Sequence, residues 1–295
     1  MRTVSLAALQ FGCSWDTAKN LATAERLMRR AADEGAQVIL APELFETPYF
    51  CAVKDSRHFE LARPLDAHPT VRRLQRLAGE LNVVIPVSLY ERAGMALFNT
   101  VVVIDADGTV LGHYRKSHIP QAAGYEEKYY FSPGDTGFRP FATAYGKLGI
   151  AICWDQWFPE TARALVLQGA EFLLYPTAIG SEPNDPEVDS MEHWRIVMRG
   201  HAGANMVPVV AANRIGHEIT GGNTMTFYGS SFIADHLGGL AATADRETEQ
   251  VLIHRVDLDA CHAYRQSWGC FRDRRPDLYG ALLSHDGSMR ERHTP

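Results

Sequence analysis

The sequence has few cysteines and no long apolar run. Its five cysteines are odd in number and no two are spaced C-x-x-C, so neither a disulfide framework nor a zinc ribbon is predicted. No apolar stretch approaches the roughly 18 residues that cross a bilayer. Residues 1–15 also lack the cleavage site of a signal peptide. We therefore expect no membrane partner and a cytoplasmic location, where free thiols persist.

The sequence also lacks an excess of basic residues. Lys and Arg number 29 against 35 Asp and Glu, which gives a formal net charge of −6, and the basic residues are scattered. This pattern argues against a nucleic-acid surface and favours a small molecule as the partner. No histidine cluster has convincing ligand spacing, so no metal site is expected.

The apolar pattern alternates strands with helices and predicts an α/β fold. Strands are expected at residues 3–11, 37–41, 83–89, 97–104, 109–115, 147–152, 171–175 and 207–212, with paired strands within 229–255. Helices are expected at residues 16–34, after Pro69, at 158–168 and at 189–204. Residues 116–137 show no clear element.

Two pairs of segments suggest an internal repeat. GAQVILAPELF (35–45) is similar to GAEFLLYPTAI (169–179), and NVVIPVS (82–88) is similar to NMVPVVA (205–211). Chance similarity is the alternative for so few residues. If the repeat is real, each half builds one layer, and the natural architecture is two sheets packed face to face with helices outside.

The chain has no linker rich in Pro, Gly or Ser between its halves, so residues 1–295 are expected to form one domain. From about residue 257 a C-terminal extension follows and ends in the polar segment SHDGSMRERHTP. The densest basic cluster, Arg-Asp-Arg-Arg at 272–275, contains an acid and suits ion pairing within the subunit or across an interface better than nucleic-acid contact.

Three polar residues stand directly after predicted strands, where enzymes of this class place reactive groups. They are Glu43, Lys116 and Cys153. Taken alone, each has an ordinary explanation: a loop cap, a solvated strand end and a small buried thiol. Together they are the set that acyl transfer requires, because a thiol needs a base and an oxyanion needs a cation or N–H donor.

Three motifs resemble those of the nitrilase superfamily of carbon–nitrogen hydrolases, and they occur in the family's order. APELF surrounds Glu43, YRKSHIP surrounds Lys116 and ICWDQWFPE surrounds Cys153. Longer stretches such as GYEEKYYFSPGDTGF (124–138) resemble one branch of that family, the N-carbamoylputrescine amidases. The resemblance extends from residue 3 to about 280 and implies an α-β-β-α sandwich.

The resemblance also implies a role for each matching residue. Cys153 would attack a carbamoyl carbon after Glu43 takes its proton, while Lys116 and the backbone N–H of Trp154 would hold the oxyanion. Glu127 matches a second glutamate that helps to position substrate and lysine, although alone it would be explained as a surface carboxylate. The family's reaction needs no metal or organic cofactor.

The residues after the nucleophile bear on the substrate. Relatives that hydrolyse N-carbamoyl amino acids carry arginine three, and in some also four, residues past the cysteine. Here these positions are Gln156 and Trp157. Without a guanidinium, a substrate carboxylate loses a bidentate partner worth about 1.5–3 kcal/mol. A carboxylated substrate is therefore disfavoured.

A substrate with a cationic tail needs a carboxylate in the pocket instead. Glu182 is the candidate, with Asp155 and Glu46 behind it, and Tyr49 and Trp154 could flank an apolar methylene chain. Their ordinary explanations are a loop-surface acid and core packing. The predicted substrate is a small carbamoyl amine.

Three functions are carried forward. The leading hypothesis is a thiol amidohydrolase acting on N-carbamoylputrescine. Its enzyme rival hydrolyses carbamoyl amino acids such as 3-ureidopropionate, or ω-amides, and a third option is a non-catalytic scaffold with the same fold. The resemblance also implies a homo-oligomer built from dimers in which the C-terminal segment crosses to the partner.

Overall fold

The computed structural model describes residues 1–181 and 187–288. Its first half alternates strands and helices as the sequence predicts. The elements are β1 (Thr3–Gln10), α1 (Thr17–Asp33), β2 (Val38–Leu40), α2 (Pro69–Leu81), β3 (Ile85–Ala93), β4 (Ala96–Ile104) and β5 (Val110–Arg115). Local signals explain the helix ends: Asp16 caps α1 by accepting from the Lys19 N–H at 3.0 Å, and Pro69 is the first residue of α2.

The second half repeats this order and adds elements that the sequence did not predict. Its elements are α3 (Glu127–Tyr130), β6 (Phe141–Thr143), β7 (Gly146–Ile150), α4 (Pro159–Leu167), β8 (Phe172–Pro176), α5 (Met191–Asn205), β9 (Val209–Ala212), β10 (Ile215–Thr220), β11 (Asn223–Tyr228), β12 (Phe232–Ala234), β13 (Leu240–Thr243), β14 (Gln250–Asp257) and α6 (Leu258–Trp268). The short helix α3, the strand β6, the β10–β11 hairpin and the helix α6 are the additions.

The strand order of the two halves is the same. One sheet has the order β6-β7-β8-β9-β12-β13. The other consists of β14-β1-β2 and β3-β4-β5, which are joined by a parallel bridge between Val38 and Val84. In each six-strand order the central three strands are parallel and the outer pairings are antiparallel. This common order favours the repeat over chance similarity.

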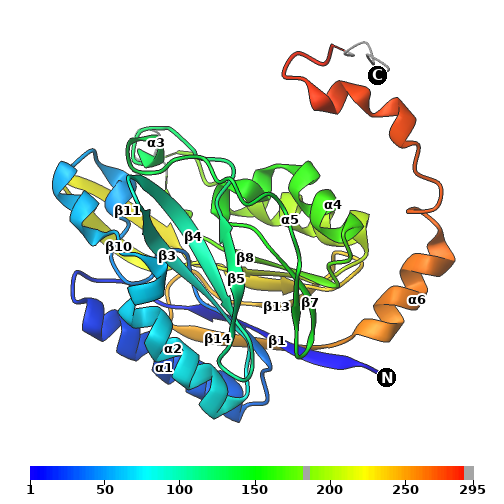
Figure 1. The fold of residues 1–295 in the computed structure, drawn as a ribbon, viewed down its shortest axis with the longest axis horizontal. Helices are drawn as coiled ribbons and strands as arrows, with labels where there is room; N and C mark the ends of the chain where they lie inside the picture. Colours follow the sequence, from blue (N-terminus) through cyan, green and yellow to red (C-terminus); the bar gives the residue numbers. More distant parts are fainter. Residues whose placement is uncertain (182–186, 289–295) are drawn as a thin grey trace.

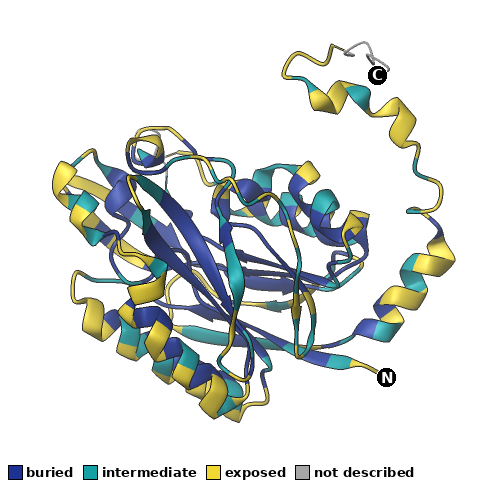
Figure 2. Ribbon diagram, viewed as in Figure 1, coloured by how far each residue is buried: buried dark blue, intermediate teal, exposed yellow. Residues whose placement is uncertain are grey.

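The elements form four layers. The two sheets pack face to face, with α1 and α2 covering one and α4 and α5 covering the other (Figure 1). Leu6, Val101 and Leu174 belong to the apolar core that the sheets share. The strands are almost wholly buried, whereas the helices expose their outer faces (Figure 2). The predicted α-β-β-α sandwich is confirmed.

The C-terminal part of the chain leaves this body. The helix α6 and the segment after it extend beyond the four layers, and most of that segment is exposed (Figures 1 and 2). At the base of α6, Asp259 accepts from the Arg2 side chain at 2.9 Å, so the start of the chain contacts this helix. Within residues 1–181 and 187–288, no helix is long and apolar enough to span a membrane.

Candidate active site

The sheets bring together the three residues that follow β2, β5 and β7. Glu43 lies in the turn after β2, Lys116 follows the last residue of β5, and Cys153 opens a 3-10 helix that ends at Trp157. All three side chains are buried, and Cys153 keeps 7% of its surface accessible. Three chain segments that are far apart in the sequence, with 73 residues between Glu43 and Lys116 alone, therefore place a carboxylate, an ammonium group and a thiol in one site.

Lys116 is held between two carboxylates. Its Nζ lies 2.9 Å from Glu43 Oε1 and 2.7 Å from Glu127 Oε2. The short helix α3 carries Glu127, whose other oxygen accepts from the Tyr49 hydroxyl at 2.6 Å. The ammonium group thus has two fixed anchors, and its direction in the site is set.

The two oxygens of Glu43 have different surroundings. Oε1 accepts from Lys116 and also from Asn99 Nδ2 at 2.7 Å. Oε2 is buried and has no hydrogen-bond partner among the described residues. Leaving a buried carboxylate oxygen without a partner costs folding free energy, so such an oxygen needs a functional explanation. This oxygen is therefore a ready proton acceptor.

Asn99 was missed from the sequence. It lies on β4, and its backbone oxygen also accepts from the Lys116 N–H at 2.8 Å. The available signal was one amide side chain inside the apolar run 97–104. Polar groups in such a strand are buried and need partners, which is a reason to look for a site.

Burial and neighbouring charges change the protonation of the site. Burial raises the pKa of the Cys153 thiol well above its usual value, and Glu43 adds to this effect while Lys116 opposes it. Burial alone would lower the pKa of Lys116, but Glu127 and Glu43 raise it above its ordinary value. Burial raises the pKa of Glu127 to about 7, against the pull of Lys116. The resting site therefore holds a protonated thiol and a charged lysine.

Asp155 fixes the backbone turn that carries Cys153 through hydrogen bonds. Cys153 has φ of +42°, a conformation uncommon for a residue with a side chain. The buried Asp155 carboxylate accepts from the Ile152 N–H at 3.0 Å, the Tyr114 hydroxyl at 2.7 Å and the His118 N–H at 2.9 Å. These contacts leave Asp155 directed at the protein and correct the sequence-based expectation of a substrate contact.

The other residues predicted to bind substrate lie in different surroundings. Trp154, next to Cys153, has a side chain that is 40% accessible, and its N–H belongs to the first turn of the 3-10 helix, where N–H groups lack helical partners. Tyr49 is buried and contacts Glu127. Glu46 accepts from Thr70 instead. Glu182 lies outside the described residues.

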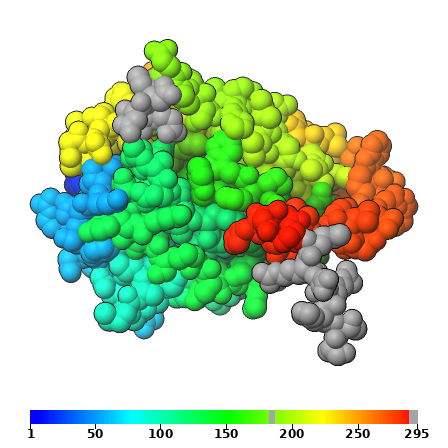
Figure 3. Space-filling model, turned by 90° about the horizontal axis from the view of Figure 1, so that it is seen from above, coloured from blue at the N-terminus to red at the C-terminus, as the bar shows by residue number. Residues whose placement is uncertain are grey.

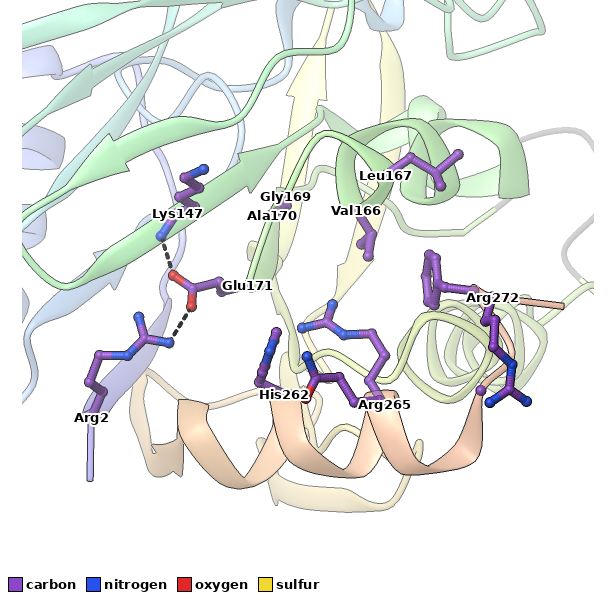
Figure 4. A pocket seen from close by; sticks show the side chains of 13 residues that line it. Arg2, Lys147, Val166, Leu167, Gly169, Ala170, Glu171, His262, Arg265 and Arg272 are labelled. Atoms are coloured by element: carbon purple, nitrogen blue, oxygen red, sulfur yellow. Dashed lines mark hydrogen bonds and ion pairs between the residues drawn. The ribbon is translucent and has the colours of Figure 1, made fainter. Parts of the chain in front are cut away.

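Other hollows offer different chemistry. A cleft of about 630 Å³ between α6 and the body is lined by Lys147, His262 and Arg265, and its carboxylate, Glu171, is already paired with Arg2 (Figure 4). No thiol lines it. Within the described part of the chain, no three His, Cys, Asp or Glu side chains are grouped to hold a metal ion.

The arrangement has the parts for acyl transfer. A thiol next to a carboxylate with a free oxygen can be deprotonated at the moment of attack. A fixed ammonium group and the backbone N–H of Trp154, in the first turn of its helix, can stabilise the oxygen charge that then develops.

Known proteins give an independent comparison. The family model described as carbon-nitrogen hydrolase matches residues 5–266. The chain is 58% identical to an N-carbamoylputrescine amidase of Arabidopsis thaliana, over 98% of each chain, and 49% identical to a citrullinase of Francisella tularensis, over 96% of this chain and 99% of the relative. A carbon–nitrogen hydrolase structure from Helicobacter pylori superposes with a TM-score of 0.89 at 36% identity, covering 96% of this chain and 99% of that one. The chain therefore belongs to the carbon–nitrogen hydrolase family.

Proposed function

We propose that this enzyme hydrolyses N-carbamoylputrescine to putrescine, carbon dioxide and ammonia, with Cys153 as the nucleophile. The observation that carries the chemistry is the unpartnered Oε2 of Glu43 in a buried site that also holds a thiol and a lysine. The substrate is supported by the 58% identity to an N-carbamoylputrescine amidase over nearly the whole chain.

The first half of the reaction forms a carbamoylated thiol. Glu43 Oε2 takes the Cys153 proton as the sulfur bonds to the carbamoyl carbon, and the carbonyl oxygen becomes an oxyanion. Lys116 and the Trp154 N–H stabilise that charge. When the oxyanion collapses, the bond to the terminal nitrogen breaks, and Glu43 returns the proton so that ammonia leaves.

The second half releases the amine. Glu43 accepts a proton from water, whose oxygen attacks the same carbon through a second oxyanion. The carbon–sulfur bond then breaks and the sulfur regains a proton. The released carbamic acid decomposes to the amine and carbon dioxide, so all atoms are accounted for without any further reactant. Glu127 acts by positioning Lys116.

Substrate selection is expected to depend on the tail of the carbamoyl compound. The residue three positions past the nucleophile is Gln156, whose Oε1 accepts from the Trp194 indole at 2.8 Å. It therefore points into the protein and supplies no cation for a carboxylate. Glu182 remains our candidate for the tail ammonium on the basis of the sequence.

A carbamoyl amino acid is the second candidate substrate. The 49% identity to a citrullinase favours it, because citrulline carries the same ureido group on a tail that has both an amine and a carboxylate. The two substrates thus differ in whether a carboxylate must be accommodated.

An ammonia-release assay separates the possibilities. We expect the highest kcat/KM for N-carbamoylputrescine, with lower values for citrulline, 3-ureidopropionate and ω-amides. Glu182→Gln should lower kcat/KM for N-carbamoylputrescine at least about thirtyfold, but change that for a neutral carbamoyl-alkylamine only a few-fold. A higher value for citrulline would overturn the substrate, and no turnover of any compound would favour the scaffold.

We also propose that the protein is cytoplasmic and forms a homo-oligomer built from dimers. Five free cysteines, of which Cys270 is exposed, suit a reducing compartment. The oligomer is proposed from the family resemblance and from the exposed C-terminal segment (Figure 2).

A further inference from the structure

A buried arginine that takes no part in the proposed reaction contacts the backbone that carries Glu43. Arg214 lies between β9 and β10 and is fully buried. Its Nη2 donates to the backbone oxygens of Glu43 at 2.6 Å and Leu44 at 3.0 Å, and its Nη1 donates to that of Thr47 at 3.2 Å. One guanidinium thus holds three carbonyls of a single turn.

The turn it holds has an unfavourable conformation. Leu44 has φ of +48°, which a residue with a branched side chain rarely adopts. Such a conformation persists where the surroundings fix it. Arg214 is one such contact, and a second is the hydrogen bond that the Leu44 N–H donates to the Ser88 hydroxyl at 3.0 Å. The direction of the Glu43 side chain is consequently set by contacts made to the next residue.

A second contact links the arginine to Glu127. Arg214 Nη1 lies 2.8 Å from Glu218 Oε1, and the other oxygen of Glu218 accepts from the Tyr49 N–H. The Tyr49 hydroxyl in turn donates to Glu127 at 2.6 Å. The ion pair therefore reaches both carboxylates that hold Lys116, one through the Glu43 backbone and one through Tyr49.

Packing fixes the plane of the guanidinium. Arg214 lies over the Phe227 ring at 5.3 Å, and the same ring meets Tyr49 edge-on at 5.9 Å. A lysine at this position could not reproduce the arrangement, because an ammonium group is a compact charge without the planar fork that reaches several acceptors.

We propose that Arg214 and Glu218 form a positioning pair that sets the places of Glu43 and Tyr49, and through Tyr49 that of Glu127, for the thiol chemistry. The inference rests on the proposed function of these residues. The pair touches no reacting atom, so its loss should lower kcat and leave KM nearly unchanged. A displacement of about 1 Å in a reacting group can cost on the order of a hundredfold in rate.

Two variants separate positioning from stability. Arg214→Lys keeps the charge and loses the fork. The double variant Arg214→Met with Glu218→Met removes both buried charges, a change that is often neutral or stabilising in other proteins. We expect each to lower kcat for N-carbamoylputrescine by about 10- to 100-fold. We expect KM within about threefold. The double variant should still fold, with a lower melting temperature because the carbonyls that Arg214 held and the Tyr49 N–H lose their partners.

The matched control is Arg199→Lys. Arg199 on α5 also donates to a backbone carbonyl, that of Gly238 at 2.8 Å, which lies in the turn between β12 and β13 and not in the turn that carries Glu43. Its kcat should stay within about twofold of the unchanged enzyme. A folded double variant or Arg214→Lys enzyme with unchanged kcat would overturn the proposal, as would losses confined to KM.

A substrate-independent measurement keeps this test separate from that of the proposed function. Iodoacetamide reacts with the thiolate form of Cys153, and Glu43 is the base that removes the thiol proton. The alkylation rate of Cys153 therefore reports on the position of Glu43. We expect alkylation of Cys153 to slow at least tenfold in both Arg214 variants, even if N-carbamoylputrescine proves to be the wrong substrate. Equal alkylation rates in folded variants would contradict the positioning role alone.

Discussion

Glu43 divides its work between two oxygens. Oε1 accepts hydrogen bonds from Lys116 and Asn99, while Oε2 is buried without a partner among the described residues. The lysine and the amide fix the carboxylate, and the free oxygen can exchange protons with a thiol and later with water. A carboxylate that is rigid on one side and reactive on the other suits a base that must act twice in each cycle.

Replacing the nucleophile should abolish turnover without unfolding the protein. Serine is nearly isosteric with cysteine, but its much higher pKa makes it a poor nucleophile for a carboxylate base. We expect Cys153→Ser to release less than about a tenth as much ammonia per unit time, with an unchanged circular dichroism spectrum. Cys270→Ser, at an exposed cysteine, is the control and should keep full activity. Substantial activity in Cys153→Ser would refute its assignment as nucleophile.

Removing the lysine should affect chemistry more than binding. Lys116→Ala takes away an oxyanion donor, which typically costs about 10²–10³ in kcat. It also leaves the Glu43 and Glu127 carboxylates buried without the cation between them, so one of them should take up a proton. Steady-state kinetics would show a loss in kcat, whereas an effect confined to KM would mean that Lys116 only binds substrate.

The activity should depend on the charge of Glu127. Its pKa is raised to about 7, mainly by burial, so this carboxyl is ionised above that pH and neutral below it. Only the ionised form balances Lys116 fully, so kcat/KM should fall as the pH is lowered through about 7. Because the groups interact, this limb belongs to the cluster as a whole. Glu127→Gln should lower the activity and displace the limb; an unchanged profile would rule Glu127 out.

At the scale of the elements, loops of both sheets supply the residues of the site. Glu43 follows β2 of one sheet and Cys153 follows β7 of the other, while Lys116 follows the edge strand β5. Asp155 joins two of these loops, because it accepts from the Cys153 turn and from His118, two residues past the lysine. The site is thus the point where the loops of both sheets meet.

Much of this arrangement was predictable, and the remainder has physical reasons. Strands with apolar runs and helices with clear caps were predicted close to their observed bounds, and Glu43, Lys116 and Cys153 were found because they follow such strands. The β10–β11 hairpin was not predicted, because its strands Ile215–Thr220 and Asn223–Tyr228 hold many polar residues and no apolar run. The roles of Asn99 and Arg214 depend on contacts across more than fifty residues, which no local pattern encodes.

A glycine behind the lysine offers a test of how the elements hold it. The Gly134 N–H donates to the Lys116 oxygen at 2.8 Å, and a Cβ there would collide with the carbonyl oxygens of Arg115 and Lys116. Gly134→Ala should therefore displace Lys116 and lower kcat by at least about tenfold, with a lower melting temperature. Gly200→Ala in α5 is the control, because the added methyl meets nothing within 4 Å. Unchanged kinetics in Gly134→Ala would show that the backbone of Lys116 tolerates the shift.

The whole molecule is a four-layer sandwich from which a C-terminal arm, residues 258–288, protrudes. In Figure 3 the C-terminal segment lies in front of the middle of the chain, and a cleft of about 780 Å³ separates residues such as Tyr279 from α4 and α5. Leu278, Leu282 and Leu283 on this arm are 63–79% exposed. Large apolar side chains gathered on a protruding segment are typical of a surface that another chain covers.

The last prediction concerns this arm and the proposed oligomer. Burying one leucine side chain contributes about 1.5–3 kcal/mol, and a symmetric dimer counts each residue twice. Leu282→Asp with Leu283→Asp would replace that gain by the cost of burying carboxylates. We therefore expect the unchanged protein to sediment as a dimer or a larger species, and the double variant to shift towards smaller ones at micromolar concentration. Met95→Asp, at a turn residue that is 99% exposed, should leave the mass unchanged. A monomeric unchanged protein, or an equal mass for the double variant, would show that the arm does not hold the subunits together.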